Sequence, residues 1–239
     1  MIRRVVVVVP AANEERRIAR CLTAIAVART CLYRVSSRVT VRTVVALDGC
    51  RDETAAIAAA WSGVQPITLQ AGNVGAARRA GTSAALAGAG PLSELWLAHT
   101  DADSQVPANW LTRMVREADL GAHLVLGTAV PGPALGAAAQ ARWLTRHHLR
   151  ENHPHVHGTN FGIRADAYLG LGGWQPLVTG EDADLARRAA RAGHLRISRT
   201  AAIPVVTSVR RGGRAPEGFS DYLSDLCPAP AADTTKVMT

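Results

Sequence analysis

Five consecutive valines at residues 5–9 constrain the fold of this chain more than any other feature. A strand with one face in solvent alternates apolar and polar residues, whereas an unbroken β-branched run indicates a strand that is buried on both faces, as in a parallel sheet. Parallel strands need long crossover connections, which are usually helical. The run therefore predicts an α/β protein in which helices cover the sheet.

The rest of the first half alternates strand and helix patterns. Further strands are predicted at residues 39–47, 67–69 and 95–98. Asn13 is expected to cap a first helix, and further helical segments follow at residues 52–61, up to Leu86 and after Pro107. This alternation indicates right-handed βαβ units. The predicted fold class is α/β, with a mostly parallel central sheet flanked by helices.

The second half is less regular. A strand is predicted at residues 123–130, helices at 135–149 and 181–192, and short strands at 195–197 and 203–206.

Polar residues follow each of the four strands predicted in the first half. They lie at residues 10–13, at Asp48, at residues 72–78 and at residues 101–104. Ligands of open parallel sheets sit beyond the carboxyl ends of the strands. We therefore expect these four polar segments to converge at one edge of the sheet.

Asp101 and Asp103 directly follow the apolar strand at residues 95–98. In an extended chain, side chains at positions i and i+2 leave the same side of the backbone, so both carboxylates can face one ligand. A divalent cation with oxygen ligands suits such a pair. The alternative is that both are solvated residues of a strand-end loop, because such short patterns also occur by chance.

The composition limits the class of partner. The chain has 239 residues, of which 48% are hydrophobic and 19% charged, and its formal net charge is +8. This surplus favours anionic partners, among them nucleotides, phosphorylated substrates, nucleic acid and acidic membrane surfaces. Aromatic residues make up only 4% and no nucleic-acid motif is present, so we expect no nucleic-acid partner and keep a basic nucleic-acid-binding protein as an alternative function.

Cysteine usage and hydropathy bear on the compartment. Four scattered cysteines show no zinc-site spacing, which favours reduced thiols in a cytoplasmic protein. The apolar start is interrupted by Pro10 and Glu14, and no stretch reaches the ~20 apolar residues of a membrane helix. We expect a cytoplasmic protein without a transmembrane segment, for which peripheral contact with the inner membrane face stays open.

Six motifs in chain order together resemble the family 2 glycosyltransferases, in particular small soluble bacterial members with the GT-A fold. They are VPAANEE at residues 9–15, ALDGCRD at 46–52, NVGAARRAG at 73–81, TDADS at 100–104, GEDADL at 180–185 and TSVRRGGR at 207–214. The resemblance covers residues 5–219. Two positions depart from the family pattern: Leu47 replaces an Asp, and Arg79 stands where Asn is usual.

The resemblance implies one GT-A domain over residues 1–226, with a nucleotide-binding half at about 1–104, an acceptor half at about 105–226 and a flexible tail at 227–239. It implies metal-dependent transfer of a sugar from a nucleotide-diphosphate donor to an acceptor hydroxyl, with Mg²⁺ or Mn²⁺ held by Asp101 and Asp103. Asp182 would be the general base of an inverting reaction. In a retaining enzyme it would position a substrate instead, and its acidic neighbours also suit a helix N-terminus without any catalytic role.

Two sets of binding residues are expected, and most of the donor set comes from the motifs of the resemblance. The donor set is Pro10, Ala11, Asn13, Glu14, Asp48, Asn73, Gly75, Arg78, Asp101, Ala102, Asp103, Arg210, Arg211 and Arg214. The acceptor set is Gly158, Thr159, Asn160, Trp174 and Glu181. Asp48 would contact the nucleobase or merely form an Asp-Gly turn. The arginine loop would close over the diphosphate or be an exposed basic loop, and Trp174 would stack on a sugar or belong to the core.

Two features leave the acceptor class open. His153, His155 and His157 alternate, so they can share one face of an extended segment beside the acceptor or, alternatively, complete a metal shell. The basic segment at residues 135–150 is compatible with a lipid-linked acceptor as well as with a partly buried helix. The acceptor can therefore be a small molecule, a glycan or a lipid-linked group, and the sequence does not indicate an oligomeric state.

Overall fold

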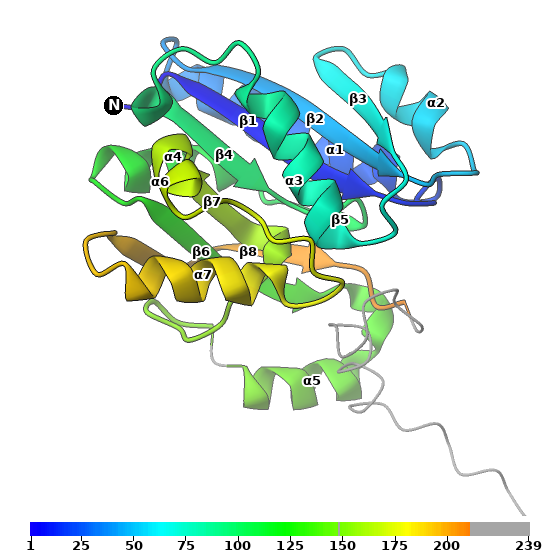
Figure 1. Cartoon of the computed structure of the whole chain (residues 1–239). Coiled ribbons are helices and arrows are strands. Elements are labelled where there is room, and N and C mark those ends of the chain that lie inside the picture. The colour runs from blue at the N-terminus through cyan, green and yellow to red at the C-terminus, as the bar shows by residue number, and fades with distance from the viewer. Residues whose placement is uncertain (148, 211–239) are drawn as a thin grey trace, which may run out of the picture.

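A computed structural model describes residues 1–147 and 149–210, which form helices on both sides of a central sheet (Figure 1). The eight strands in these residues follow the order β3-β2-β1-β4-β7-β6-β8-β5. Their bounds are β1 Arg4–Ala11, β2 Thr40–Asp48, β3 Val64–Leu69, β4 Leu95–His99, β5 Ser104–Gln105, β6 Leu124–Pro131, β7 Phe161–Arg164 and β8 Ile197–Thr207. Only β7 and β5 run antiparallel to their neighbours, so this described sheet is mostly parallel, as predicted.

The helices divide between the two faces of the sheet. Their bounds are α1 Ile18–Val35, α2 Thr54–Ala59, α3 Val74–Leu86, α4 Trp110–Asp119, α5 Ala137–Arg146, α6 Ala165–Gly170 and α7 Glu181–Arg191. Single 3-10 turns lie at η1 Leu92–Glu94, η2 Pro133–Leu135 and η3 Gly158–Asn160. Val5, Val7 and Val9 pack with α1, α2 and α4, whereas Val6 and Val8 pack with α3, α6 and α7. The valine run is therefore buried on both faces because successive strand residues point in opposite directions.

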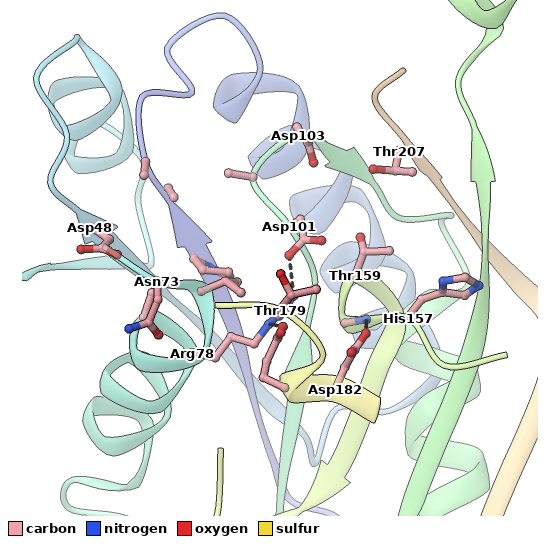
Figure 2. Close-up of a pocket in the computed structure, with 18 of the residues that line it drawn as sticks. Asp48, Asn73, Arg78, Asp101, Asp103, His157, Thr159, Thr179, Asp182 and Thr207 are labelled. Atoms are coloured by element: carbon pink, nitrogen blue, oxygen red, sulfur yellow. Dashed lines mark hydrogen bonds and ion pairs between the residues drawn. The ribbon is translucent and has the colours of Figure 1, made fainter. Parts of the chain in front are cut away.

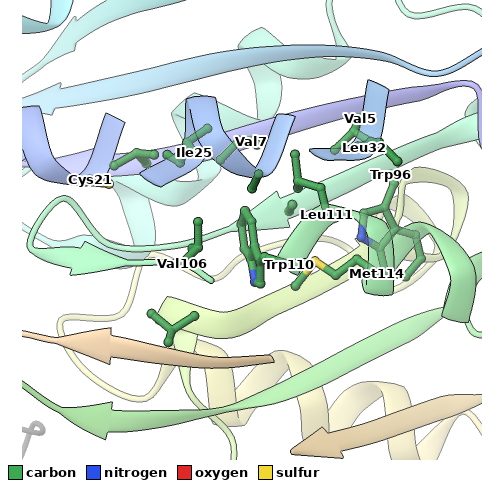
Figure 3. Close-up of a cluster of buried hydrophobic side chains, with 14 of the residues drawn as sticks. Val5, Val7, Cys21, Ile25, Leu32, Trp96, Val106, Trp110, Leu111 and Met114 are labelled. Atoms are coloured by element: carbon green, nitrogen blue, oxygen red, sulfur yellow. The ribbon is translucent and has the colours of Figure 1, made fainter. Parts of the chain in front are cut away.

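The larger core lies between β1, α1 and α4 (Figure 3). Trp110, Leu111 and Met114 are fully buried on one face of α4 and meet Leu32 of α1 in the same cluster. Each such side chain contributes roughly 1.5–3 kcal/mol by leaving water. This burial holds the sheet together, and the polar residues lie at the C-terminal ends of its strands.

Two predicted boundaries are wrong. Asn13 does not cap α1: it has a left-handed backbone (φ 56°), and the helix begins at Ile18 after a turn in which the Glu14 carbonyl accepts the N–H groups of Arg17 and Ile18. The two short strands expected near the end form one strand, β8, because it lies parallel to β6 along its length apart from one register shift.

Three short elements were not predicted, namely β5, β7 and α6. β7 has four residues including Gly162, whose missing side chain leaves room for the indole of Trp96. Such short pairings depend on partners distant in sequence and leave no periodic pattern. The proposed domain end at residue 226 and the tail at 227–239 lie outside the described residues.

Candidate active site

A cavity of about 650 Å³ opens where β1, β2 and β4 end (Figure 2). The polar segments that follow these strands meet there with the start of α7 and the end of β8. The predicted site residues that line it are Pro10, Ala11, Glu14, Asp48, Asn73, Arg78, Asp101, Ala102, Asp103, Gly158, Thr159, Glu181, Asp182 and Arg210. The structure thus gathers most of both predicted sets into one cavity.

Arg78 lies at the centre of an acidic cluster. Its Nη2 donates to Asp101 Oδ1 at 2.6 Å and its Nε donates to Glu181 Oε1 at 3.0 Å. Burial raises the pKa of the Asp101 carboxyl, and Asp103 and Asp182 add to the shift, although Arg78 opposes it. Burial likewise raises the pKa of Glu181 against the effect of Arg78. The Arg78 guanidinium therefore does not offset the effect of burial on the pKa values of these two carboxyls.

The buried Arg78 guanidinium packs over an aromatic ring. Its guanidinium carbon lies 5.5 Å from the ring centre of Trp174, which is fully buried. His99 meets Trp174 edge to face at 4.9 Å, and burial lowers the pKa of His99 well below its usual value. Trp174 is therefore buried under Arg78, which favours the alternative that it belongs to the core over a stacking face for a sugar.

Asp103 is joined to the end of the described chain. Ser208 Oγ donates to Asp103 Oδ2 at 2.5 Å, and Arg210 Nη2 lies 3.4 Å from the same oxygen. Arg210 also pairs with Glu14, which is buried. The residues after β8 thus cover the second carboxylate of the Asp101–Asp103 pair. Arg211 and Arg214, predicted beside Arg210, lie outside the described residues.

Asp182 stands in the first turn of α7 with its carboxylate held in a fixed plane. Its Oδ2 accepts the Gly158 N–H at 2.6 Å and its Oδ1 accepts the N–H of Ala183 at 2.7 Å. Gly158 has no room for a side chain, because a Cβ there would lie 2.5 Å from Arg78 Nη2. The turn at Gly158 therefore brings Asp182 close to the Arg78 cluster.

Asp48 and Asn73 shape the donor end of the cavity. Asp48 Oδ1 accepts the N–H groups of Ala71 and Gly72 at 2.7 and 3.0 Å, so this side chain braces the loop after β3. Asn73 Oδ1 caps α3 by accepting the Ala76 N–H at 2.7 Å. Both residues also line the cavity.

Three further predicted residues are absent from the cavity wall. The exposed Asn13 accepts the Arg51 N–H, and Gly75 donates its N–H to the Leu177 carbonyl. Asn160 is fully buried and its amide bonds to Trp110, to the Thr128 carbonyl and to the Ile203 carbonyl. Its polar atoms thus join α4, β6 and β8, which explains why it does not face an acceptor.

Sequence reasoning missed some lining residues, among them His147, Thr179, Thr207 and Ser208. Thr207 ends β8 and Ser208 follows it. Because β8 is parallel to β6, the rule applied to the first four strands could have found both residues. Thr179 carries no such signal, because it lies in an irregular segment that reaches the cavity through tertiary contacts.

A stack of histidine rings borders the other end of the cavity. His147 stacks on Trp143 at 4.4 Å, and His155 lies 5.2 Å from His147 and 5.9 Å from His157. Burial, together with the neighbouring histidines, lowers the pKa of His157 to about 4. Among the described residues, no group of three or more His, Cys, Asp or Glu side chains could hold a metal ion.

The sequence comparison decides the family. Residues 6–170 match the family described as Glycosyl transferase family 2, which is more than half of the chain. The chain belongs to this family. A search of curated proteins finds no match.

Solved structures similar to this family 2 member include glycosyltransferases from three organisms. Residues 1–349 of TarS from S. aureus have a TM-score of 0.61 and 16% identity, over 86% of this chain and 60% of that TarS fragment. The mannosyltransferase PcManGT from Pyrobaculum calidifontis, in complex with GDP-Man and Mn²⁺, has a TM-score of 0.63 and 21% identity, over 90% and 59% of the two chains. Glucosyl-3-phosphoglycerate synthase from Mycobacterium tuberculosis has a TM-score of 0.56 and 19% identity, over 94% and 76%.

These likenesses establish the GT-A fold, and the chain spans about 60% of the length of the first of these structures. Within the part of the chain that the structure describes, no helix is long and apolar enough to cross a membrane.

Proposed function

We propose that this protein transfers a sugar from a nucleotide-diphosphate donor to an acceptor hydroxyl in a metal-dependent, inverting reaction. One observation carries the proposal: the Asp101–Asp103 pair and Asp182 line the same cavity. The complexes of PcManGT with GDP-Man and Mn²⁺ and of the M. tuberculosis synthase with Mn²⁺, UDP-glucose and phosphoglyceric acid support this function by analogy of fold.

The charge of the cavity fits a bound cation. Six carboxylates line it, from Glu14, Asp48, Asp101, Asp103, Glu181 and Asp182, against two guanidinium groups among the described residues. This acidic cavity lies in a chain of net charge +8, and it would repel a diphosphate unless a cation bridged the two. Asp101 and Asp103 supply hard oxygen ligands for Mg²⁺ or Mn²⁺. Bound there, the ion would act as a Lewis acid on the diphosphate oxygens.

The remaining steps fall to side chains of this chain. Asp182 removes the proton of the acceptor hydroxyl while the oxygen attacks the anomeric carbon. The bond from that carbon to the diphosphate oxygen breaks, and its electron pair leaves with the nucleoside diphosphate. Arg210, next to Asp103, can stabilise the charge that develops on this leaving group. A single displacement of this kind inverts the anomeric configuration.

The acceptor enters at the end of the cavity formed by His157, Gly158 and Thr159. The proposed base lies at this end, because Asp182 accepts a hydrogen bond from the Gly158 N–H. A small molecule, a glycan and a lipid-linked group all remain candidate acceptors. Peripheral membrane contact would use exposed Leu144 and the exposed arginines of α5.

Donor screening tests the proposal. UDP-, GDP-, TDP- and ADP-sugars with Mn²⁺ should raise the melting temperature for one nucleotide class, because a ligand of the native state stabilises it. Asp103→Ala should abolish this shift and the metal-dependent turnover, whereas the matched control Asp166→Ala, at an acid outside the cavity, should retain both. Metal-independent binding that survives Asp103→Ala would contradict the metal site. Salt-sensitive binding of DNA or RNA without nucleotide binding would favour the alternative function.

A further inference from the structure

Helix α3 contacts the segment at residues 175–180, here called the strap. The contact is made at Gly75, where the helix has no side chain. The Gly75 N–H donates to the Leu177 carbonyl at 3.1 Å. A Cβ on Gly75 would lie 2.2 Å from the Gln175 carbonyl oxygen and 2.7 and 2.8 Å from the backbone N and O of Leu177. These three atoms all belong to the backbone. A methyl group at Gly75 therefore cannot be accommodated unless the strap moves.

The same face of α3 makes a second contact just beyond the strap. Arg78, three residues after Gly75, pairs through Nε with Glu181 at 3.0 Å. Residues three apart share one face of a helix. Glu181 is the first residue of α7 and Asp182 is the second. α3 thus fixes the strap and the start of α7 from one side.

Most side chains of the strap are exposed. Leu177 and Val178 are 39% and 52% exposed, so their side chains contribute little packing. The strap ends at Gly180 (φ +79°), and Gly173 (φ +68°) lies shortly before it, both in a backbone conformation that favours glycine. Because Val178, Thr179 and Gly180 also line the cavity, a shift of the strap would change the cavity wall.

We propose that Gly75 is a positioning residue, whose missing side chain sets the strap and thereby the place of Asp182 in the cavity. The inference rests on the proposed role of Asp182 as the base. The family motif suggests that Gly75 binds the donor, but its N–H is bonded to Leu177 and it does not line the cavity. Gly75 therefore acts on the reaction through the strap. A catalytic base displaced by about 1 Å can lower the rate on the order of 10²-fold.

The test compares glycine-to-alanine variants of the full chain. Gly75→Ala should lower kcat at least ~10-fold, leave the Kd of the donor nucleotide within ~2-fold and speed hydrogen exchange of the amides of residues 175 and 177–182. Gly170→Ala is the matched control, because a Cβ there meets nothing within 4 Å. Gly81→Ala, whose Cβ would lie 2.6 Å from Val8 Cγ1, should lose stability without faster exchange in the strap.

A second variant covers the case in which Gly75→Ala does not fold. Leu177→Gly leaves α3 intact and frees the backbone of the strap, so it should also lower kcat with nucleotide affinity retained. If whichever of these two variants folds has the wild-type kcat and unchanged hydrogen exchange in the strap, the inference is overturned. A parallel loss of kcat and nucleotide affinity would overturn it as well. If Asp182→Asn keeps full turnover, the proposed base is wrong instead, and the exchange data still test whether Gly75 positions the strap.

Discussion

Arg78 and Glu181 form an ion pair with 3.0 Å between Nε and Oε1, although they lie 103 positions apart in the chain. Their side chains are only 2% and 7% exposed. Arg78 comes from α3 in the expected nucleotide-binding half, and Glu181 begins α7 in the expected acceptor half. This pair therefore joins the two halves of the cavity directly beside Asp101 and Asp182.

Removing one member of this pair should be costly. Glu181→Ala leaves the Arg78 guanidinium buried with less compensation, so the free energy of unfolding should fall by about 3–5 kcal/mol. Urea unfolding measures the change. The control Glu94→Ala breaks the exposed contact with Arg3 at 3.5 Å and should cost no more than about 1 kcal/mol. Equal effects of the two variants would show that the buried pair does not stabilise the fold.

Asp182→Asn should separate catalysis from the helix N-terminus. Turnover should fall ~10²–10⁴-fold, because an amide cannot take the acceptor proton, while nucleotide affinity stays nearly unchanged. The control Asp184→Asn changes another acid of the same first turn, one that pairs with Arg188 at 2.7 Å, and should retain turnover. A comparable loss of turnover in both variants would indicate a structural role for these acids.

The histidine stack should make stability depend on pH. The pKa of His157 is about 4 in the folded protein and near its usual 6.5 in the unfolded chain. Between these values only the unfolded chain binds the proton, so this histidine removes stability as the pH falls from 6.5 to about 4 and changes nothing above 6.5.

Comparison with His157→Gln isolates this contribution. The raised pKa values of Asp101 and Glu181 add stability as the pH falls, but they do so in both proteins and cancel in the difference. The difference in unfolding free energy between the two proteins should change by on the order of 2–3 kcal/mol across this range. Parallel pH profiles would contradict the burial of neutral His157.

Trp174 offers a test of core packing against sugar stacking. Trp174→Ala should lower the free energy of unfolding by about 3–5 kcal/mol, because it leaves a cavity beneath Arg78. Thermal or urea unfolding without any substrate measures this loss. Unchanged stability together with a raised KM for the acceptor would instead assign Trp174 to a sugar-binding surface.

Much of the fold was predictable because its patterns are local. The valine run indicated β1 as a strand buried on both faces, and the polar strand ends indicated the edge at which the cavity opens. Asn160 and Trp174 were expected at the acceptor from their neighbours in the sequence alone, with Trp174 as a core residue left open as the alternative. Their surroundings come from α4, β6, β8 and α3, so no local pattern could show that both are buried.

The sequence by itself determined the α/β class, the order of the motifs and the spacing of Asp101 and Asp103, since strand periodicity and motif spacing are properties of neighbouring residues. Only the tertiary structure decided which charges face one another: Arg78 between Asp101 and Glu181, Ser208 on Asp103, and the strap against Gly75. These contacts join residues 23 to 105 positions apart or depend on the backbone path of the strap. The packing of helices on the sheet sets these distances, and burial then makes each unpaired charge expensive.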